Sequence, residues 1–489
     1  MNPLKRGVLT LLSLAALAFL VFLSQWHRLL FPLGDNEGFY GFYALQMGRG
    51  LQLYRDLWDH KPPGLFLQYF LLGRIFPLDE IHLRLCVCVV HLLNAVLLSL
   101  LGRKLGLDRI SAGTAALFYA LFLFPSLLQP WSAEADLLGL PFLLAALTLA
   151  FSPSGAASFL SGACFALSLL TKQSVGLVLP AFLAIPGFLN MKKIGIWISG
   201  AGVGLAAVLF PIYLDGRFPE FWDSLTRFNR YYVSNSWDFF LSSQPYQAFE
   251  FKWLLTFLLL YGLPLAGLLL FLVRRTSSPQ APTTRLFVGL WFFGALASCF
   301  LSAYFYSYYF IALLPPLSLA LACELQKGPG MRFYRVALFL GWALAAALAT
   351  GLNVKGTGDK IFSFCQYAID RLEADKSMGQ LLRREAAPGD KLFCWSCDPT
   401  LYAYSGLPMA VVRTPVINHL RFLTRDAQAA QARFAEELPK YCVVSRAPQI
   451  FPEPDWLVQK LQENYMRVNF MPGTDTQGLE LYVLSGEKN

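Results

Sequence analysis

The chain has 489 residues, of which 56% are hydrophobic and only 15% are charged. Soluble domains carry about 25% charged residues, so this composition excludes an ordinary soluble domain and indicates an integral membrane protein. The formal net charge of +9 does not indicate nucleic-acid binding, because no stripe of lysine and arginine with stacking residues accompanies it; basic cytoplasmic loops explain it better.

The first apolar segment runs from Gly7 to about Leu23 and follows Lys5 and Arg6. No small-x-small cleavage site follows it, so we interpret it as an uncleaved membrane helix rather than a signal peptide. Because a span needs about 20 apolar residues, we expect further spans near 82–101, 110–128, 135–151, 156–171, 174–190, 194–213, 253–273, 286–303, 305–323 and 333–351. This makes about eleven helices, or fewer if the short pair 156–171 and 174–190 forms one re-entrant hairpin.

Basic residues fix the expected orientation, since cytoplasmic loops are enriched in lysine and arginine. A cytoplasmic N-terminus places every second loop inside, with these clusters: Lys5/Arg6, Arg103/Lys104/Arg109, Lys192/Lys193, Arg274/Arg275/Arg285 and Lys327/Arg332/Arg335. The loops 30–81 and 215–252, and everything after about residue 352, then lie outside. We expect a multi-pass protein of the bacterial inner (cytoplasmic) membrane, with its site on the periplasmic or outer face.

The first outer loop contains the stretch GDNEGFYGFYALQMGRGLQLYRDLWDHKPP, from Gly34 to Pro63. Asp35 and Glu37 stand two residues apart just beyond the first helix. A carboxylate at the edge of a membrane cavity can act as a general base, because partial desolvation raises its proton affinity. The alternative is that Asp35 simply caps a helix running through Ala44 and Met47.

The end of the same loop, Asp59-His60-Lys61-Pro62-Pro63, combines a compact cation with a rigid turn. Such a lysine is suited to holding a phosphate, although a membrane-interface lysine before a helix-starting proline would have the same sequence. His60 is a candidate ligand for a divalent metal ion of unknown identity, a phosphate donor or an interfacial side chain.

Further ionisable residues are expected at the same face of the membrane. Glu134 and Asp136 begin a span after a short outer turn, Lys172 separates two short apolar segments, and Arg84 lies at the outer end of the second span. Each cation alone could be an anchoring side chain. Together, acids suited to a hydroxyl or a metal and cations suited to a phosphate indicate a binding site.

The outer loop 215–252 alternates aromatic and charged residues and predicts amphipathic helices in the membrane interface, bordering a groove for a lipid chain. Arg230 in this loop is another candidate phosphate ligand. The turn Ser302–Tyr309 supplies phenolic groups, among them Tyr304, although an aromatic belt is an equally good explanation.

After Gly351 the composition changes, which predicts two domains: a transmembrane domain over 1–351 and an extracytoplasmic α/β domain over 352–489. We expect strands at Lys391–Trp395, Tyr441–Ser445 and Leu479–Leu484, and helices at Ala427–Leu438 and Asp455–Tyr465. Cys394 and Cys397 have CxxC spacing, but no second pair completes a zinc site. A strand-borne pair is favoured over a disulfide.

These residues together resemble the GT-C polyprenyl-phosphate-sugar glycosyltransferases, in the bacterial branch related to protein O-mannosyltransferases and lipid A aminoarabinose transferases. The likeness includes the acidic first-loop motif, Tyr54-Arg-Asp56, Lys61-Pro-Pro63, Lys172, the tyrosine-rich turn before Leu314-Pro-Pro316, and the C-terminal domain. The family pattern Asp-Glu-x-x-Tyr is matched here by Asn36-Glu37-Gly38-Phe39-Tyr40, so an amide takes the aspartate position. His60 stands where an acid is common.

The resemblance implies an inverting transfer of a hexosyl or pentosyl group from a polyprenyl-phosphate donor, such as undecaprenyl phosphate, to an acceptor protein, lipid or glycan. It implies a first-loop acid as base, Asp35 or Glu37, and donor phosphate contacts from Lys61 and Lys172. Arg84 and Arg230 are expected beside the phosphate as well. We expect donor or acceptor contacts from Tyr40, Tyr54, Glu134, Asp136 and Tyr304, and a divalent metal, if present, at His60 and Glu134.

The glycosyltransferase is expected to act as a monomer. Two other functions fit parts of the sequence. A transporter or flippase of lipid-linked sugars predicts ionisable groups at the bilayer midplane and inverted repeats, whereas these charges gather at one interface. A glycan ligase or polymerase would use a diphosphate-linked donor instead of a monophosphate.

Overall fold

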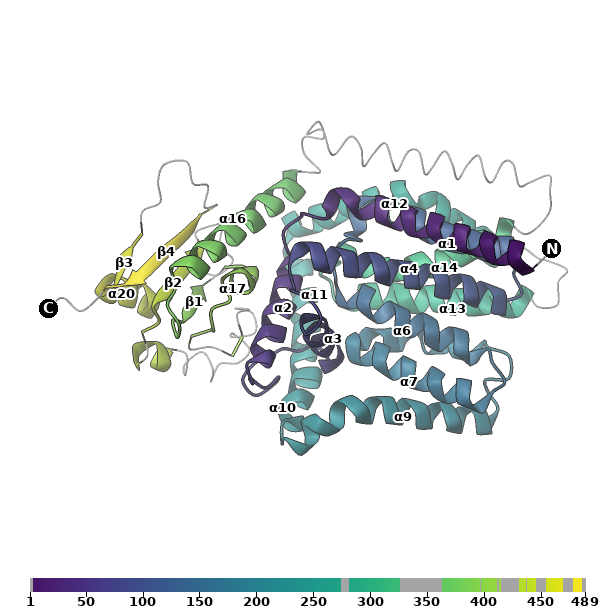
Figure 1. Cartoon of the computed structure of the whole chain (residues 1–489), viewed down its shortest axis with the longest axis horizontal. Helices are drawn as coiled ribbons and strands as arrows, with labels where there is room; N and C mark the ends of the chain where they lie inside the picture. The colour runs from purple at the N-terminus through teal and green to yellow at the C-terminus, as the bar shows by residue number, and fades with distance from the viewer. Residues whose placement is uncertain are drawn as a thin grey trace.

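A computed structural model describes residues 3–273, 281–325, 363–395, 397–410, 413–414, 431–436, 438–445, 454–468 and 478–485. They form a bundle of long helices and a smaller C-terminal unit built around a sheet (Figure 1). The expected span 333–351 lies outside the described residues, and the expected helix Ala427–Leu438 is described only over 431–436 and at Leu438.

The bundle contains helices that run roughly parallel to one another (Figure 1). They are α1 (Pro3–Gln25), α4 (Glu80–Lys104), α5 (Arg109–Phe122), α6 (Ala135–Ala150), α7 (Gly155–Thr171), α9 (Met191–Leu214), α12 (Gln244–Val273), α13 (Ala281–Phe300) and α14 (Leu314–Leu325). Near the end facing the C-terminal unit lie α2 (Asp35–Gly48), α3 (Pro63–Gly73), α10 (Phe218–Asp223) and α11 (Asn229–Ser242). The first outer loop therefore folds mainly into two short helices, of which α3 was not anticipated.

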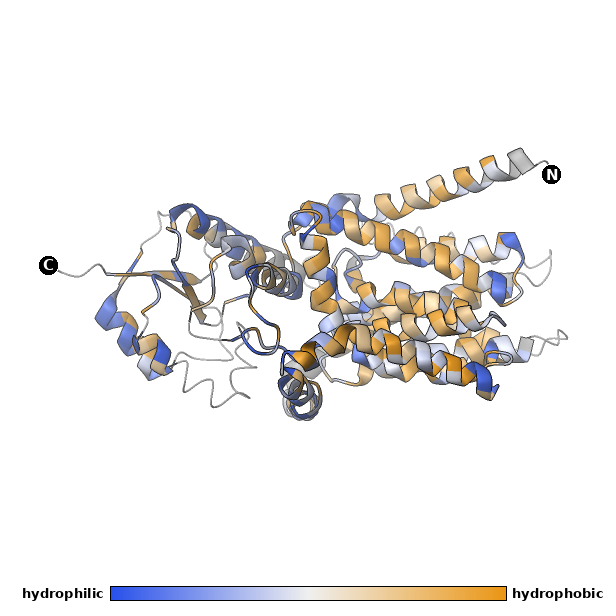
Figure 2. Ribbon diagram, turned by 60° about the horizontal axis from the view of Figure 1, so that its bottom comes forward, coloured by the Kyte–Doolittle hydropathy of each residue, from blue (hydrophilic) through white to orange (hydrophobic). Residues whose placement is uncertain are grey.

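Five segments of the described chain are long and apolar enough to cross a membrane: Thr10–Arg28, Glu80–Lys104, Met191–Leu214, Pro282–Phe300 and Ser307–Glu324. Others are shorter. Helix α6 has 16 residues, which gives about 24 Å against the roughly 30 Å of a hydrocarbon core. The expected span 174–190 is a 3₁₀ helix, η3 (Gln173–Val178), followed by the four-residue α8 (Pro180–Leu183). Figure 2 shows the bundle mostly in hydrophobic colours and the C-terminal unit in more hydrophilic ones.

Small residues let α7 and α9 pack closely. A Cβ atom on Gly162 of α7 would lie 1.9 Å from the backbone oxygen of Trp197 on α9, so no larger residue fits without moving a helix. Close backbone approach through small residues is the usual way in which membrane helices gain packing energy, because lipid tails remove most of the hydrophobic driving force.

The C-terminal unit has a four-stranded sheet in the order β1-β2-β4-β3. Strand β1 (Leu392–Trp395) is parallel to β2 (Tyr441–Ser445), and β4 (Leu479–Leu484) is antiparallel to both β2 and β3 (Tyr465–Arg467). β1, β2 and β4 coincide with the three expected strands, and α20 (Asp455–Asn464) with an expected helix. Three elements were not predicted from the sequence: β3, α16 (Ser363–Glu385) and α17 (Thr400–Ser405). Cys394 and Cys397 are free thiols.

The C-terminal unit contacts the bundle through α16 and α17. The backbone N–H of Leu33 donates to the Tyr404 hydroxyl over 2.8 Å, and that hydroxyl donates to Glu80 over 2.8 Å. The Lys376 ammonium lies 2.9 Å from the same Glu80 carboxylate. These contacts attach the unit to the starts of α2 and α4, beside the first outer loop.

Candidate functional site

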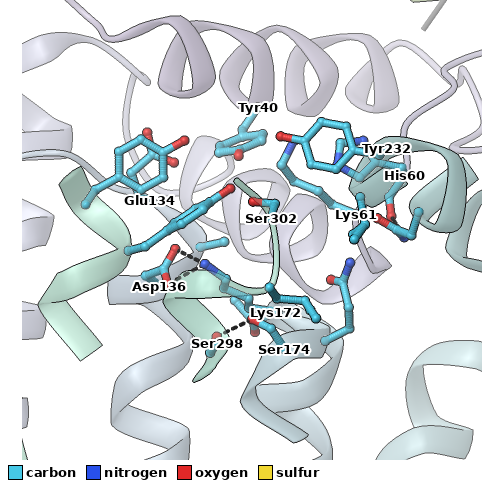
Figure 3. A pocket seen from close by; sticks show the side chains of 18 residues that line it. Tyr40, His60, Lys61, Glu134, Asp136, Lys172, Ser174, Tyr232, Ser298 and Ser302 are labelled. Carbon is cyan, nitrogen blue, oxygen red and sulfur yellow. Dashed lines mark hydrogen bonds and ion pairs between the residues drawn. The ribbon is translucent and has the colours of Figure 1, made fainter. Parts of the chain in front are cut away.

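A polar cavity of about 100 Å³ opens near the bundle end that carries α2 and α3 (Figure 3). A single water position needs only about 10–15 Å³ on this measure, so the cavity has room for several waters or a polar group. Six of the predicted site residues line it: Tyr40, His60, Lys61, Glu134, Asp136 and Lys172. They come from the first outer loop, the N-cap and first turn of α6, and the end of α7.

Lys61 is held in place by its own loop. The Asp59 carboxylate accepts from the backbone N–H of Lys61 at 2.8 Å, and the Tyr54 hydroxyl donates to the Lys61 carbonyl at 2.8 Å. Tyr54 itself has a φ of 73°, an uncommon conformation that persists only where its surroundings enforce it. The Lys61 ammonium lies 3.7 Å from Asp59 and 5.3 Å from the centroid of the Tyr40 ring.

Packing of α3 on α7 brings the two predicted phosphate-binding lysines to one cavity. Gly64 follows Lys61-Pro62-Pro63, and a Cβ atom there would lie 2.6 Å from the backbone oxygen of Leu170. One turn further along α3, the Gln68 amide donates to the Thr171 hydroxyl over 2.7 Å. The glycine therefore permits the start of α3 to reach the end of α7, where Lys172 begins a new segment.

Lys172 forms an ion pair with Asp136. Its backbone is extended, with φ −147° and ψ 111°, where α7 ends and η3 begins. The ammonium donates to both Asp136 carboxylate oxygens and lies 3.7 Å from the centroid of the Tyr309 ring. Because the lysine and aspartate side chains are only 14% and 4% exposed, this cation is already neutralised by a buried partner.

Glu134 lies in the turn before α6 and is held by Asn36. The Asn36 amide donates to the two Glu134 oxygens at 3.3 and 3.2 Å and to the Tyr308 hydroxyl at 2.9 Å. Glu134 is only 4% exposed. Burial, and then the Glu37 charge, raise the pKa of Glu134 to about 8, while the Lys61 charge and the Asn36 hydrogen bond oppose that shift.

Glu37 and Arg84 pair with each other instead of reaching the cavity. The guanidinium donates to the two Glu37 oxygens at 2.5 and 2.9 Å, and the backbone N–H groups of Gly34 and Ala133 donate to the same carboxylate at 2.9 and 2.7 Å. Both side chains are fully buried. This geometry differs from the expected roles of Glu37 as base and Arg84 as phosphate ligand, because each already has its partners inside the protein.

Asp35 is not among the residues that line the cavity. It is the first residue of α2, after the N-cap Gly34, and it is exposed. Asp35 hydrogen-bonds the buried Asp398 carboxyl of the C-terminal unit, and burial followed by the Asp35 charge raises the pKa of Asp398. Successive residues on a helix point about 100° apart, so Asn36 faces Glu134 while Asp35 faces the neighbouring unit. The expectation that Asp35 acts at the cavity is not supported by this arrangement.

The remaining predicted residues lie around the cavity. Arg230 is exposed on α11 and is not part of the lining. The Tyr304 ring is tilted against that of Tyr232, with 5.0 Å between the centroids, and Tyr232 does line the cavity. The residues that sequence reasoning missed are Asn36 and Tyr308. Asn36 carried a signal, since it occupies the aspartate position of the resembled pattern, and Tyr308 belongs to the tyrosine-rich turn.

The predicted metal ligands, His60 and Glu134, both line the cavity. The His60 ring packs beside the rings of Phe228 and Tyr232, at centroid distances of 5.0 and 5.1 Å. Among the residues described, no three His, Cys, Asp or Glu side chains come together in a way that could hold an ion. His60 and Glu134 thus lack a third ligand from that part of the chain. The requirement for a divalent metal ion therefore stays a prediction.

Comparison with known proteins identifies the fold. No protein-family model and no curated protein matches the sequence. Among solved structures, ArnT from Cupriavidus metallidurans bound to undecaprenyl phosphate matches with a TM-score of 0.61, at 15% identity over 97% of each chain. The apo structure of the same protein matches with a TM-score of 0.62, at 16% identity over 98% of each chain. The chain therefore has the fold of ArnT, which confirms the expected GT-C fold.

Proposed function

We propose that this protein is an inverting glycosyltransferase that moves a sugar from a polyprenyl-phosphate donor to an acceptor outside the cytoplasm. One observation carries the proposal. Lys61 and Lys172 are far apart in the sequence, yet both line one cavity that also contains Glu134. Cations beside a carboxylate suit a phosphate leaving group and a proton-bearing acceptor. The shared fold with ArnT, one structure of which contains undecaprenyl phosphate, supports that donor class.

The proposed topology places this cavity on the outer side of the bacterial cytoplasmic membrane. The N-terminus lies at the end of the bundle away from the C-terminal unit (Figure 1). Helix α4 starts beside that unit at Glu80 and ends at Lys104, and α9 begins after Asn190 with Lys192 and Lys193. The basic helix ends are thus opposite the cavity, as the positive-inside rule requires for an outer site. The proposal includes the expected spans over 1–351 apart from 174–190, which folds as a 3₁₀ segment and a four-residue helix, and an extracytoplasmic α/β domain over 352–489.

The cavity offers specific groups to the donor phosphate. As the bond between the sugar and the phosphate breaks, its electron pair passes to the phosphate oxygen and negative charge accumulates there. The Lys61 and Lys172 ammonium groups favour that charge more strongly in the transition state than in the ground state. Tyr40 is fully buried in the lining, and its hydroxyl has no hydrogen-bond partner among the described residues, so it can donate to a ligand oxygen.

Lipid binding tests the proposal directly. Purified wild-type protein and Lys61→Met are titrated with undecaprenyl phosphate and, separately, with undecaprenyl diphosphate. A charged hydrogen bond contributes about 1.5–3 kcal/mol, so Lys61→Met should bind the monophosphate roughly 10–100-fold more weakly. The matched control is Lys192→Met, an exposed lysine at the start of α9, which should bind like wild type.

Three outcomes contradict the proposal. Equal binding of the monophosphate by wild type and Lys61→Met removes the lysine from the donor site. A clear preference of wild type for the diphosphate favours a ligase or polymerase instead. Lipid transport without sugar transfer, measured in vesicles that carry the purified protein, favours the flippase alternative.

A further inference from the structure

We propose that Glu134, and neither acid of the first outer loop, removes the proton from the acceptor, with Asn36 as its positioning residue. This inference rests on the proposed glycosyl transfer and names the group that completes it. It follows from the partners that the structure gives to each acid near the cavity.

The other acids already have partners. Glu37 accepts four hydrogen bonds, two of them from Arg84. Asp35 hydrogen-bonds Asp398 at the boundary with the C-terminal unit. Two carboxylates line the cavity among the described residues, Glu134 and Asp136. Asp136 forms an ion pair with Lys172, whereas Glu134 has no ion pair among those residues.

Asn36 fixes the orientation of the Glu134 carboxylate. Its amide lies 3.3 and 3.2 Å from the two oxygens and 2.9 Å from the Tyr308 hydroxyl. Residues 36 and 40 are one turn apart on α2 and share a face, and Tyr40 lines the cavity. An amide cannot take up a proton at neutral pH, but it can hold a carboxylate in one rotamer. This makes Asn36 a positioning residue and leaves the acid–base chemistry to Glu134.

The surroundings of Glu134 suit a general base. Burial and the neighbouring Glu37 charge raise the pKa of Glu134 to about 8, while Lys61 and Asn36 lower it and Asp136 raises it further. Tyr40 and Tyr308 line the same cavity, and the Tyr308 hydroxyl accepts from the Asn36 amide that also holds Glu134. A base with a pKa near the working pH combines a usable ionised fraction with strong proton affinity.

The step balances in atoms and charge. The acceptor O–H (or N–H) bond breaks, its proton passes to a Glu134 oxygen, and the acceptor atom forms a bond to the anomeric carbon. The bond from that carbon to the phosphate oxygen breaks, and its electron pair stays on the phosphate. Glu134 loses one negative charge as the phosphate beside Lys61 and Lys172 gains one, so the total charge of the site does not change.

The test uses Glu134→Gln, which keeps the shape of the side chain and an oxygen for the Asn36 amide. Full-length wild type and variant are given undecaprenyl-phosphate-linked pentoses and hexoses, and sugar transfer or release to water is measured. General-base catalysis contributes about 10²–10⁴-fold, so Glu134→Gln should lose that factor while binding undecaprenyl phosphate within about threefold of wild type. The control Glu220→Gln, the same change at an exposed site on α10, should transfer normally.

A pH profile separates a base from a structural carboxylate. The wild-type rate should rise through about pH 8, in line with the pKa of Glu134, and the residual rate of Glu134→Gln should lack this rise. Asn36→Ala should move the rise to higher pH, because the amide stabilises the ionised carboxylate. A merely structural asparagine would lower the rate without moving the profile.

The possible failures are distinct. Transfer that survives in Glu134→Gln and disappears in Asp35→Asn overturns the inference and restores the first-loop acid. Loss of undecaprenyl phosphate binding in Glu134→Gln, in step with the rate, also overturns it, because Glu134 would then belong to the donor site. If wild-type protein neither binds undecaprenyl phosphate nor releases sugar from any of these donors, the proposed function itself fails.

Discussion

The buried pair of Glu37 and Arg84 provides the sharpest test of the structure, because the sequence assigned both residues to the reaction and the structure places neither in the cavity. Arg84→Met removes a guanidinium that donates to Glu37 at 2.5 and 2.9 Å and to the Pro32 carbonyl at 3.1 Å. The methionine fills much of the same volume and leaves the Glu37 carboxylate buried without its cation.

The expected cost follows from burial. Both side chains are 0% exposed, and removing one partner of such a pair typically costs about 3–5 kcal/mol, because the remaining charge has neither water nor a counter-ion. The surface pair of Arg227 and Asp223 is the matched control: its side chains are 68% and 41% exposed, so Arg227→Met should cost about 0.5 kcal/mol or less. The double variant Glu37→Gln/Arg84→Met should be more stable than Arg84→Met alone, since it removes both charges.

Unfolding in detergent measures these differences. The three purified variants and wild type are unfolded by heat and by denaturant at one protein and detergent concentration, and each is also titrated with undecaprenyl phosphate. We expect a large loss of stability in Arg84→Met, partial recovery in the double variant and near-normal lipid affinity in the folded fraction. An Arg84→Met protein that is as stable as wild type but no longer binds the lipid would refute the structural role and make Arg84 a phosphate ligand after all.

Three further predictions concern the cavity. Tyr54→Phe removes the hydroxyl that donates to the Lys61 carbonyl; it should weaken undecaprenyl phosphate binding by the equivalent of about 0.5–1.5 kcal/mol, and binding equal to wild type would show that the Tyr54 hydroxyl does not support Lys61. Gly64→Ala places a methyl group 2.6 Å from the Leu170 carbonyl; it should lower stability by about 1–3 kcal/mol and weaken lipid binding as α3 moves from α7, and an unaffected unfolding curve would contradict the close packing. Because the folded pKa of Glu134 is raised from 4.5 to about 8, its contribution to stability is fully present below pH 4.5 and is lost as the pH rises to about 8. The thermal midpoint of wild type should therefore fall more than that of Glu134→Gln between pH 5 and pH 9, within the window set by that shift, and parallel curves would count against the raised pKa.

The charges in and around the cavity nearly cancel, and this explains how a membrane protein can hold so many ionisable groups near one place. Lys172 has Asp136, Lys61 has Asp59 at 3.7 Å, and Arg84 has Glu37. Burying an unpaired charge is expensive, so these pairs keep the empty site stable. An incoming phosphate anion then shares a lysine with its aspartate instead of meeting a bare cation.

Much of this protein was determined by the sequence alone, because the relevant properties are local. Apolar runs predict membrane segments through the thickness of the bilayer, and this located α1, α4, α9 and α13. Short hydrophobic runs bounded by polar residues predicted β1, β2 and β4. The first-loop motif directed attention to Lys61, which does line the cavity. The 3₁₀ segment after Lys172 was harder to predict. The stretch 174–190 is as apolar as a membrane span, but its helices, η3 and α8, are too short to cross a bilayer.

Only the tertiary structure decided which ionisable groups share the cavity. Asp35, Asn36 and Glu37 are consecutive, yet the helix turns them about 100° apart, toward Asp398, Glu134 and Arg84 respectively. No rule of sequence spacing links Glu37 to a guanidinium 47 residues away or Asn36 to a carboxylate 98 residues away. Those partners depend on how α2, α4 and the turn before α6 pack together, and packing determines which acid is neutralised and which one remains available to a ligand.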